Sequence, residues 1–481
     1  MPSALIIGTG FAGIGMAIEL QRAGLGDVTL LEKAADLGGV WRENTYPGAG
    51  CDIPSPYYSF SFAPNPLWPM RFSLREDIHA YLGAVTDRYR LREKIHFNTE
   101  VTGAAWDEGR GVWRVETATG RTYEANVLIP AVGQLSRPAW PAIPGRETFT
   151  GHAFHSAEWD HSGDLTGRRV AVIGTGASAI QFVPRIQPEV GQLTLFQRSA
   201  PYVVPKADTA YRPWQHTLYR RIPQTQLLER AFFWALCEFA TVGLKSDNAI
   251  TRSVDLLARA MRRRQIKDPV LRAKLTPDYP AGCKRVLFAS NYYPALTQPN
   301  VSVETNPVKE ITPTGVRTAG GAHHAADVII YATGFRTTEF LGPMKVLGLA
   351  GRDLRDIWSG GARAYYGIAV PGFPNMFLMY GPNTNLGCGS IIYMLERQAR
   401  YIRQAVQHLA ATGSSSVDVR SEVADRFDEE VQRRLGHSVW SLCRSWYREP
   451  TGRISTNWPG LVSEYHRRTR TLDPSDYRVT P

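Results

Sequence analysis

The chain has 481 residues, of which 43% are hydrophobic and 21% charged, and its 55 Lys and Arg exceed its 44 Asp and Glu by eleven. This composition is typical of a folded globular protein and excludes a disordered, fibrous or membrane-embedded chain. At about 100 to 200 residues per domain, the length predicts two to four domains.

The five cysteines, at positions 51, 237, 283, 388 and 443, form no Cys-x-x-Cys pair and no cluster with His. This spacing indicates neither a zinc site nor a disulfide framework, so we expect free thiols, no metal and a cytoplasmic setting. Only three residues precede the first apolar run, too few for a secretory signal. The most apolar stretch, 231–244, is shorter than the roughly 18 to 20 residues that span a bilayer, and we expect a buried helix there.

A strand, a glycine-rich turn, a helix and a second strand are predicted at the start of the chain. An apolar run at 4–7 precedes the string Gly8-Thr9-Gly10-Phe11-Ala12-Gly13, and a helical pattern leads to a strand that ends at Glu32. Gly8 permits a tight turn, Gly10 lets the backbone approach a pyrophosphate, and Gly13 allows close packing of helix on strand. Glu32 is placed to bind a ribose, so the unit predicts a dinucleotide site.

A second unit of this type begins at an apolar run at 169–173, which is followed by Gly174-Thr175-Gly176-Ala177-Ser178. Two such units imply two dinucleotides. At the position that Glu32 occupies in the first unit, the second unit has Gln197-Arg198-Ser199. An arginine there attracts a 2′-phosphate, which favours NADPH over NADH. The alternative is that Arg198 is a solvated strand end.

Two further strands, at 127–133 and 328–334, end in glycine, as expected where the chain passes between two nucleotide-binding domains. Between 206 and 281 helical spacing replaces the strand signals and predicts a helical insertion. We expect most of its aromatic residues in the core and a few in a substrate pocket: Tyr211, Trp214, Tyr219, Phe232, Phe233, Trp234 and Phe239. The arginines at 259, 262, 263 and 264 are expected on a solvated helix face.

Two longer strings name a family. The first is Gly39-Val40-Trp41, then Tyr46-Pro47-Gly48 and Asp52, and the second runs from Phe149 through Gly151, His155 and Trp159 to Asp160. Both match the patterns of type I Baeyer-Villiger monooxygenases at every specified position, and the chain resembles that family. The related flavin-containing monooxygenases usually carry Tyr and then Lys or Arg where this chain has Trp159-Asp160. A third segment, Gly282-Cys283-Lys284-Arg285, looks like the one that carries the family's active-site arginine.

The resemblance implies an α/β fold with two Rossmann-like dinucleotide-binding domains, for FAD and NADPH, and the helical insertion. The implied FAD domain comprises 1–140 and 336–481, the second part including segments of the substrate pocket. The implied NADPH domain comprises 150–205 and 281–335, and the insertion is 206–280. The implied cofactor-binding residues are Gly8, Gly10, Phe11, Ala12, Gly13, Glu32, Lys33, Gly39, Val40, Trp41, Asp52, Gly174, Gly176, Ala177, Ser178, Arg198, Ser199, Lys284, Thr333 and Gly334.

The family's reaction sets the roles of the charged residues. NADPH reduces FAD, and the reduced flavin reacts with O2 to give a peroxyflavin that inserts oxygen beside a ketone carbonyl, yielding an ester or lactone. An anionic peroxide needs a fixed cation and a dry pocket. The resemblance implies Arg285 as this catalytic cation, with Asp52 holding it in place, and Lys284 beside Arg198 at the NADPH phosphate. The alternative is that Lys284 and Arg285 form a plain basic doublet at a domain edge.

His155 and Trp159 are expected on the linker between the domains, where His155 would couple NADPH binding to domain orientation. The alternative is a structural histidine. Trp41 is expected to pack beside the flavin.

The chain departs from the family pattern at two places. Gly50 replaces a common arginine, and Cys388-Gly389 replaces a His-Asn pair near the expected flavin ring. The second loss would enlarge or dry the site, or mark a changed reaction. The pocket is expected between the insertion and loops near Cys388 and 440–446.

Two other functions remain open from the sequence. The same flavin chemistry would serve oxygenation of sulfur or nitrogen, or hydroxylation. A non-catalytic flavoprotein with an anionic partner is the more distant alternative, although the basic residues are dispersed and no nucleic-acid motif is present. The expected partners are therefore a small ketone and O2, with no nucleic acid and no integral membrane segment. Nothing in the sequence indicates an oligomeric state.

Overall fold

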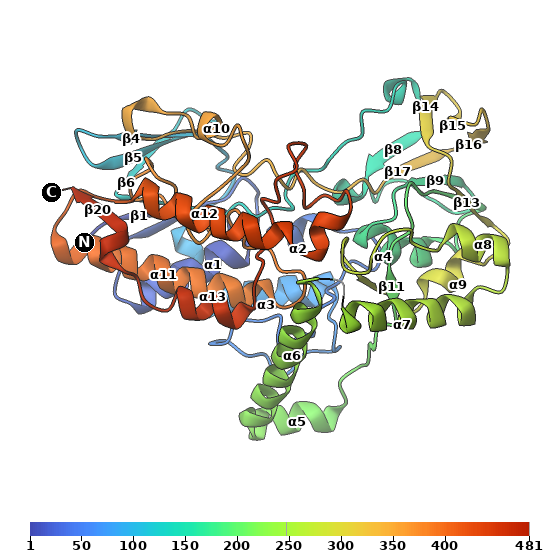
Figure 1. The fold of residues 1–481 in the computed structure, drawn as a ribbon, viewed down its shortest axis with the longest axis horizontal. Coiled ribbons are helices and arrows are strands. Elements are labelled where there is room, and N and C mark those ends of the chain that lie inside the picture. The colour runs from blue at the N-terminus through green and yellow to red at the C-terminus, as the bar shows by residue number, and fades with distance from the viewer. Residues whose placement is uncertain (247, 481) are drawn as a thin grey trace.

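The computed structural model describes residues 1–246 and 248–480. Two parallel sheets form its two ends, the first at the left and the second at the right of Figure 1. The first sheet has the order β3-β2-β1-β7, where β1 is Ala4–Ile7, β2 Val28–Leu31, β3 Ile95–His96 and β7 Val127–Pro130. All residues of β1 and β7 are buried, as in a parallel strand that is covered on both faces.

The two faces of β1 contact different layers. Ile6 belongs to the core that includes α1 (Phe11–Arg22) and α11 (Ile391–Thr412). Leu5 and Ile7 pack instead with Trp113 of a second, four-stranded sheet. That sheet has the order β18-β4-β5-β6, with bounds Lys345–Leu347, Val101–Asp107, Val112–Thr117 and Thr122–Ala125. This alternation encloses the first nucleotide-binding sheet on both sides.

The second parallel sheet has the order β13-β10-β9-β17-β8, whose bounds are Val301–Glu304, Gln192–Phe196, Arg169–Ile173, Val328–Tyr331 and His152–His155. Its apolar interior packs against α4 (Ala177–Ile186) and α9 (Tyr292–Leu296). The chain enters this sheet after β7 and leaves it after β17. The two connections lie together, because Ala139 N donates to Gly334 O at 2.8 Å.

Shorter elements complete the fold. The remaining strands are β11 (Val203–Val204), β12 (Leu287–Phe288), β14 (Val308–Thr312), β15 (Gly315–Thr318), β16 (His323–Ala325), β19 (Ser416–Val419) and β20 (Tyr477–Thr480). The remaining α-helices are α2 (Val40–Glu43), α3 (Arg75–Arg88), α5 (Pro213–Arg221), α6 (Pro223–Gly243), α7 (Ala249–Gln265), α8 (Pro269–Lys274), α10 (Leu354–Ile357), α12 (Ser421–Gly436) and α13 (Val462–Arg468). In the described part of the chain, 3-10 turns lie at Arg92–Lys94, Arg146–Thr148, Ser156–Glu158, Leu349–Gly351, Val439–Leu442 and Pro474–Asp476.

Helices α5 to α8 follow one another between β11 and β12, and α5 and α6 stand away from both sheets (Figure 1). The expectation of a buried helix at 231–244 is wrong. Phe232 and Phe239 of α6 are each 63% exposed, and Trp214 of α5 is 60% exposed. Of the aromatic residues expected in the core, Tyr211 and Tyr219 are buried. The sequence pattern predicted a helix but carried no information on which side of it would be covered.

The expectation of five free thiols is also wrong. Cys283 and Cys443 form a disulfide across 160 residues of sequence, and their Cα atoms are 6.1 Å apart. Cys51, Cys237 and Cys388 are free. The bridge joins the segment that carries Arg285 to the C-terminal part of the chain. The spacing of the cysteines in the sequence does not predict this disulfide, because only the tertiary fold brings the two residues together.

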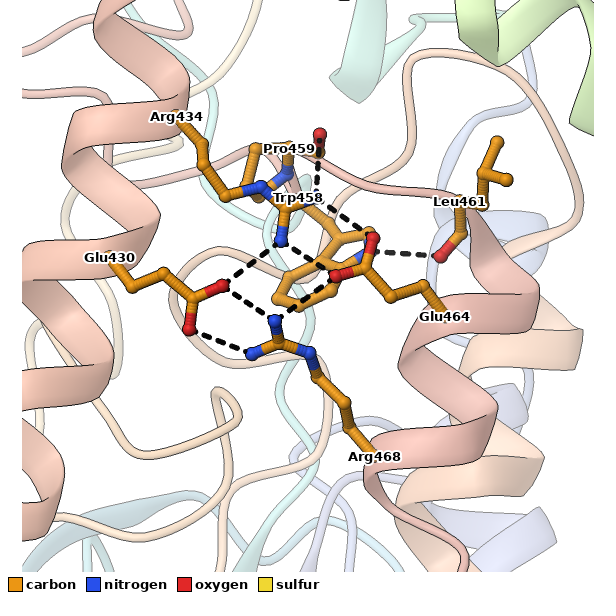
Figure 2. Close-up of polar contacts among 7 residues, drawn as sticks. All are labelled: Glu430, Arg434, Trp458, Pro459, Leu461, Glu464 and Arg468. Carbon is orange, nitrogen blue, oxygen red and sulfur yellow. Dashed lines mark hydrogen bonds and ion pairs between the residues drawn. The ribbon is translucent and has the colours of Figure 1, made fainter.

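The C-terminal helices α12 and α13 are joined by an ionic network around Trp458 (Figure 2). Arg434 binds the carboxylate of Glu464 with two hydrogen bonds of 2.7 and 2.8 Å, and Arg468 binds Glu430 at 2.5 and 2.9 Å. Trp458 is buried beneath the two guanidinium groups, and its backbone N–H donates to Asn385 O at 2.9 Å. The network therefore braces the loop that leads to Cys388.

Candidate active site

The first glycine-rich turn forms a tight cradle at the N-terminus of α1. Gly8 has a φ of +101°, and a Cβ at this position would lie 2.8 Å from Ala131 O. A Cβ at Gly13 would lie 1.9 Å from Gly8 O, so a side chain there would push the helix off the strand. At Gly10 the nearest atom to such a Cβ is Gly39 Cα, at 3.8 Å. The backbone is thus open where a phosphate would approach.

Glu32 ends β2 next to this cradle and is buried. Its Oε2 accepts hydrogen bonds from the backbone N–H of Thr9 at 3.0 Å and from the Thr9 hydroxyl at 2.7 Å, while Oε1 accepts from Ala34 N. A carboxylate has about four acceptor sites, so one remains for a ribose hydroxyl. Thr9 fixes the orientation of the acid, a role that the spacing of the glycines did not reveal.

The second cradle has the same construction at the N-terminus of α4. Gly174 has a φ of +114°, and a Cβ there would lie 2.3 Å from Ala332 O. Around Gly176 and Gly334 a Cβ would meet nothing within 4 Å, which leaves open space on the surface. Thr333 donates its hydroxyl hydrogen to Ala139 O at 2.7 Å and ties the cradle to the interdomain connection.

Two cations lie at the end of β10 beside this cradle. Lys284 Nζ donates to Ser199 Oγ at 2.8 Å and lies 4.3 Å from the centre of the Tyr279 ring. Burial and the positive charge of Arg198 lower the pKa of Lys284. Cations that repel one another across an open surface are typical of a phosphate site. The structure thus brings together Arg198, Ser199 and Lys284, which the sequence analysis had paired.

Arg285 forms an ion pair with Asp52 between the two halves of the molecule. Its Nη2 donates to both carboxylate oxygens, at 2.8 and 2.6 Å. The side chain of Asp52 is 17% exposed and that of Arg285 is 40% exposed, so the guanidinium still faces open space. The charge of Asp52 raises the pKa of Arg285 further, against the effect of burial. The cation is therefore fixed in both position and charge.

The loop that carries Asp52 is anchored on the second sheet's helix α4. Tyr46 donates its hydroxyl hydrogen to Gln181 Oε1 at 2.9 Å, and Gln181 Nε2 donates to Gly50 O at 2.9 Å. Gln181 thus holds the loop from both ends. Sequence reasoning missed this residue because a glutamine inside a helix carries no motif.

Sulfur and aromatic groups line the approach to Arg285. A hydrogen bond to Cys388 and burial raise the pKa of the Cys237 thiol, so these two thiols face each other. Burial raises the pKa of Tyr447 to about 12, against the charge of Arg285, and also raises that of Tyr380. The phenols of Tyr380 and Tyr447 are therefore protonated at pH 7. Cys237 comes from α6 of the insertion, and Tyr380 and Tyr447 were not foreseen.

His155 is fully buried at the end of β8, between the two interdomain connections. Its ring centre lies 5.5 Å from that of Trp140 and 6.2 Å from that of Phe335. Its Nδ1 accepts a hydrogen bond from Ala157 N at 3.1 Å, and burial lowers its pKa to about 4. The ring is neutral at pH 7 and lies at the junction of the domains.

The other residues of the two long strings have packing contacts. Trp159 lies 5.2 Å from Phe182 of α4 between ring centres. Asp160 accepts hydrogen bonds from Ser162 and pairs with His152 at 2.7 Å. Trp41 donates its indole N–H to the Tyr58 hydroxyl at 3.1 Å.

A model of the pyridine nucleotide-disulphide oxidoreductase family matches residues 5–231. A Baeyer-Villiger monooxygenase of Pseudomonas aeruginosa is 45% identical over 478 residues, which cover 99% of this chain and 91% of the relative. Another, of Streptomyces coelicolor, is 44% identical over 477 residues, 98% of this chain and 92% of the relative.

The chain belongs to the Baeyer-Villiger monooxygenase family. A steroid monooxygenase bound to NADP superposes with a TM-score of 0.89 at 31% identity, covering 100% of this chain and 99% of the other. A closed structure of cyclohexanone monooxygenase superposes with a TM-score of 0.90 at 27% identity, with the same coverage. The predicted family, fold class and enzyme class, a flavin-dependent monooxygenase, are confirmed.

Proposed function

We propose that this Baeyer-Villiger monooxygenase uses FAD, NADPH and O2 to insert one oxygen atom beside the carbonyl of a small ketone, giving an ester or lactone. The observation that carries the proposal is the Arg285–Asp52 pair, which lies between two dinucleotide cradles, near the protonated phenols of Tyr380 and Tyr447. Structural neighbours bound to NADP, and to FAD with NADP, support the choice of cofactors. A cytoplasmic location belongs to the same proposal, because NADPH is a cytoplasmic reductant.

The cradles fit the two dinucleotides. FAD would lie over Gly8, Gly10 and Gly13 with its ribose at Glu32, since a Cβ at Gly8 or Gly13 would collide with backbone. Phe11, Ala12, Lys33, Gly39, Val40 and Trp41 would surround it. NADPH would lie over Gly174 and Gly176, beside Ala177, Ser178, Thr333 and Gly334, with its 2′-phosphate at Arg198, Ser199 and Lys284. We also propose the domain division 1–140 with 336–481, and 150–205 with 281–335.

Bound FAD, once reduced by NADPH, supplies the electrons that activate O2. The protein's own groups do the rest. Arg285 places a permanent cation where negative charge develops on oxygen and on the ketone carbonyl. Asp52 holds the guanidinium in one orientation through its two hydrogen bonds. Because Arg285 belongs to the NADPH half and Asp52 to the FAD half, closing the halves also completes the site.

The residues near Arg285 favour a site that holds little water. Cys388 and Gly389 stand where the family has a His-Asn pair, and the phenols of Tyr380 and Tyr447 stay protonated. A pocket of this kind binds an apolar ketone better than a polar one, since buried polar groups need partners.

The test is oxygen uptake and product analysis on a panel of cyclic, linear and aromatic ketones, with matched sulfides. We expect ketone-stimulated uptake of O2 and an ester or lactone that carries one oxygen atom from O2. Sulfoxides or N-oxides as the only products across the panel would assign heteroatom oxygenation instead. A protein that cannot be reconstituted with FAD would refute the proposal.

A further inference from the structure

The outer face of α6 is apolar along its whole length. Leu228 is 70% exposed, and Phe232 and Phe239 are each 63% exposed. Leu227, Leu236 and Val242 on the same helix are 49%, 50% and 41% exposed. The positions 228, 232, 236, 239 and 242 follow the three- and four-residue spacing of one helix face. A surface helix ordinarily places polar residues on its exposed face, so the apolar face of α6 indicates contact with a partner.

The inner face of α6 carries polar side chains that fix the orientation of the helix. Arg230 donates to Pro56 O at 2.8 Å and to Ser59 O at 2.9 Å. Glu238 accepts a hydrogen bond from Val462 N at 2.8 Å, and Gln226 donates to Asn65 O at 2.6 Å. Rotating the helix to bury its apolar side would break all of these contacts. These hydrogen bonds therefore hold the apolar face of α6 toward the outside of the molecule.

Helix α5 extends the apolar surface. It packs on α6, and Trp214 is 60% exposed, while Ile222 between the two helices is 49% exposed. We call Trp214, Ile222, Leu227, Leu228, Phe232, Leu236, Phe239 and Val242 the α5–α6 face. The two helices project from the molecule, away from both sheets (Figure 1). Single exposed apolar residues are ordinary, but a contiguous group of this kind marks an interaction site.

The charges around the face indicate the partner. Residues 212–272 contain twelve Lys or Arg and five Asp or Glu, so this segment carries seven of the eleven surplus cations. Arg212, Arg220 and Arg221 are exposed on or beside α5. Nearby acids are engaged within the protein: Glu229 accepts hydrogen bonds from the Tyr211 and Tyr219 hydroxyls at 2.9 and 2.6 Å. The face thus presents apolar and aromatic groups with cations beside them.

Apolar and aromatic side chains with cations beside them are typical of helices that lie in the interface of a membrane. Trp and Phe partition to the boundary between headgroups and acyl chains, and arginines bind anionic headgroups. Among residues 1–246 and 248–480 no helix is long and apolar enough to cross a bilayer.

We propose that the α5–α6 face docks this enzyme on the surface of a bilayer that contains anionic lipid. Its apolar side chains enter the headgroup region, and Arg212, Arg220 and Arg221 contact lipid phosphates. The interaction is peripheral and reversible, since it depends on one apolar face and a few charges. It does not depend on the oxygenation reaction.

The experiment is vesicle co-sedimentation of the full-length, FAD-loaded protein. Vesicles of phosphatidylcholine alone are compared with vesicles of phosphatidylcholine and phosphatidylglycerol, at low and high salt. We expect binding to the mixed vesicles that weakens with salt. The double variants Phe232→Ser/Phe239→Ser and Arg220→Glu/Arg221→Glu should each lower the partition coefficient at least about ten-fold.

Matched controls come from surfaces far from the insertion. Val479→Ser, on the exposed strand β20, removes an apolar side chain, and Arg426→Glu/Arg433→Glu on the exposed side of α12 reverses two charges. Both should bind vesicles as the unchanged protein does, and circular dichroism checks that every variant is folded.

Three results would overturn the proposal. The first is that the unchanged protein does not sediment with the mixed vesicles at low salt. Equal losses in the control and test variants would remove the α5–α6 face from the interaction. A mass that doubles with concentration, and returns to the monomer in Phe232→Ser/Phe239→Ser without any vesicle binding, would assign the face to a second copy of the chain.

Discussion

Arg285 is the residue on which the proposed chemistry depends most. Asp52 raises its pKa above an already high value, so its charge does not change at any working pH. Its neighbours Tyr380 and Tyr447 are neutral, which leaves the guanidinium as the cation that faces the pocket. We therefore expect that any pH dependence of the reaction does not arise from titration of Arg285.

We expect Arg285→Ala to lower the rate of product formation at least about 100-fold, because the charge on oxygen loses its stabilising cation. Flavin reduction by NADPH should continue, since Arg198 and Lys284 remain in place. Anaerobic flavin reduction and product per NADPH consumed are the two measurements. Arg110→Ala, at an exposed arginine remote from the pocket, is the control. Unchanged product formation in Arg285→Ala would remove this residue from the mechanism.

Arg198 and Lys284 test the choice of reductant. Each should contribute a charge-assisted contact to the 2′-phosphate, so Arg198→Ala and Lys284→Ala should each raise the KM for NADPH by about 10- to 100-fold. The KM for NADH, which lacks that phosphate, should stay unchanged in both variants. Steady-state kinetics with the two reductants checks this. An equal rise for NADPH and NADH would show that these cations do not recognise the phosphate.

At the scale of single elements, the disulfide ties the Arg285 segment to the turn at Val439–Leu442 and the loop beyond it. Cys283 is fully buried, and its partner Cys443 follows Trp440, which packs against the loop at Gly387. The bridge and the ionic network of α12 and α13 therefore both restrain the loop that carries Cys388.

Removing the bridge should cost stability because it closes a loop across 160 residues. We expect Cys443→Ser to lower the free energy of unfolding by about 2 to 4 kcal/mol. Thermal melts with and without a thiol reductant measure this. The reductant should lower the Tm of the unchanged protein to that of Cys443→Ser and leave the variant unaffected. Identical Tm values under both conditions would mean that the bridge does not stabilise the fold.

At the scale of the whole molecule, the contacts that relate the halves include the Cys283–Cys443 disulfide, the Arg285–Asp52 pair and the docking of Gln181 on the loop from Tyr46 to Gly50. The covalent connections pass together beside His155. A change in the angle between the halves would therefore alter both the contact between Arg285 and Asp52 and the surroundings of His155. This supports the prediction that His155 couples NADPH binding to domain orientation.

The buried His155 predicts an acid-sensitive stability. Its pKa is about 4 in the folded state because of burial, against about 6.5 when unfolded, so acid favours the unfolded state. Its contribution is fully present above pH 6.5 and is lost as the pH falls toward 4, by up to about 3 kcal/mol. Urea unfolding between these pH values should show a smaller loss in His155→Phe than in the unchanged protein. His437→Phe, at an exposed histidine, is the control, and equal losses in all three would contradict the assignment.

Motif residues were largely predictable because their constraints are local. Gly13 is required by the carbonyl of Gly8 one turn away, and Gly8 and Gly174 by the positive φ of their own turns. Glu32 and Arg198 follow at fixed distances along a strand, helix and strand. The pairing of Arg285 with Asp52 was available only through the resemblance to a family. Gln181, Tyr380 and Tyr447 have no such signal, since their roles come from long-range packing.

The sequence by itself determined the two nucleotide units, the order of the elements and the chemistry of the site, because glycine turns and apolar periods act within a few residues. Only the tertiary structure decided that Cys283 pairs with Cys443 and that Cys237 meets Cys388, since these contacts cross more than a hundred residues of chain. It also decided which face of α6 is covered. The helix is apolar enough to be buried, but three polar contacts on its other side hold that apolar face outward.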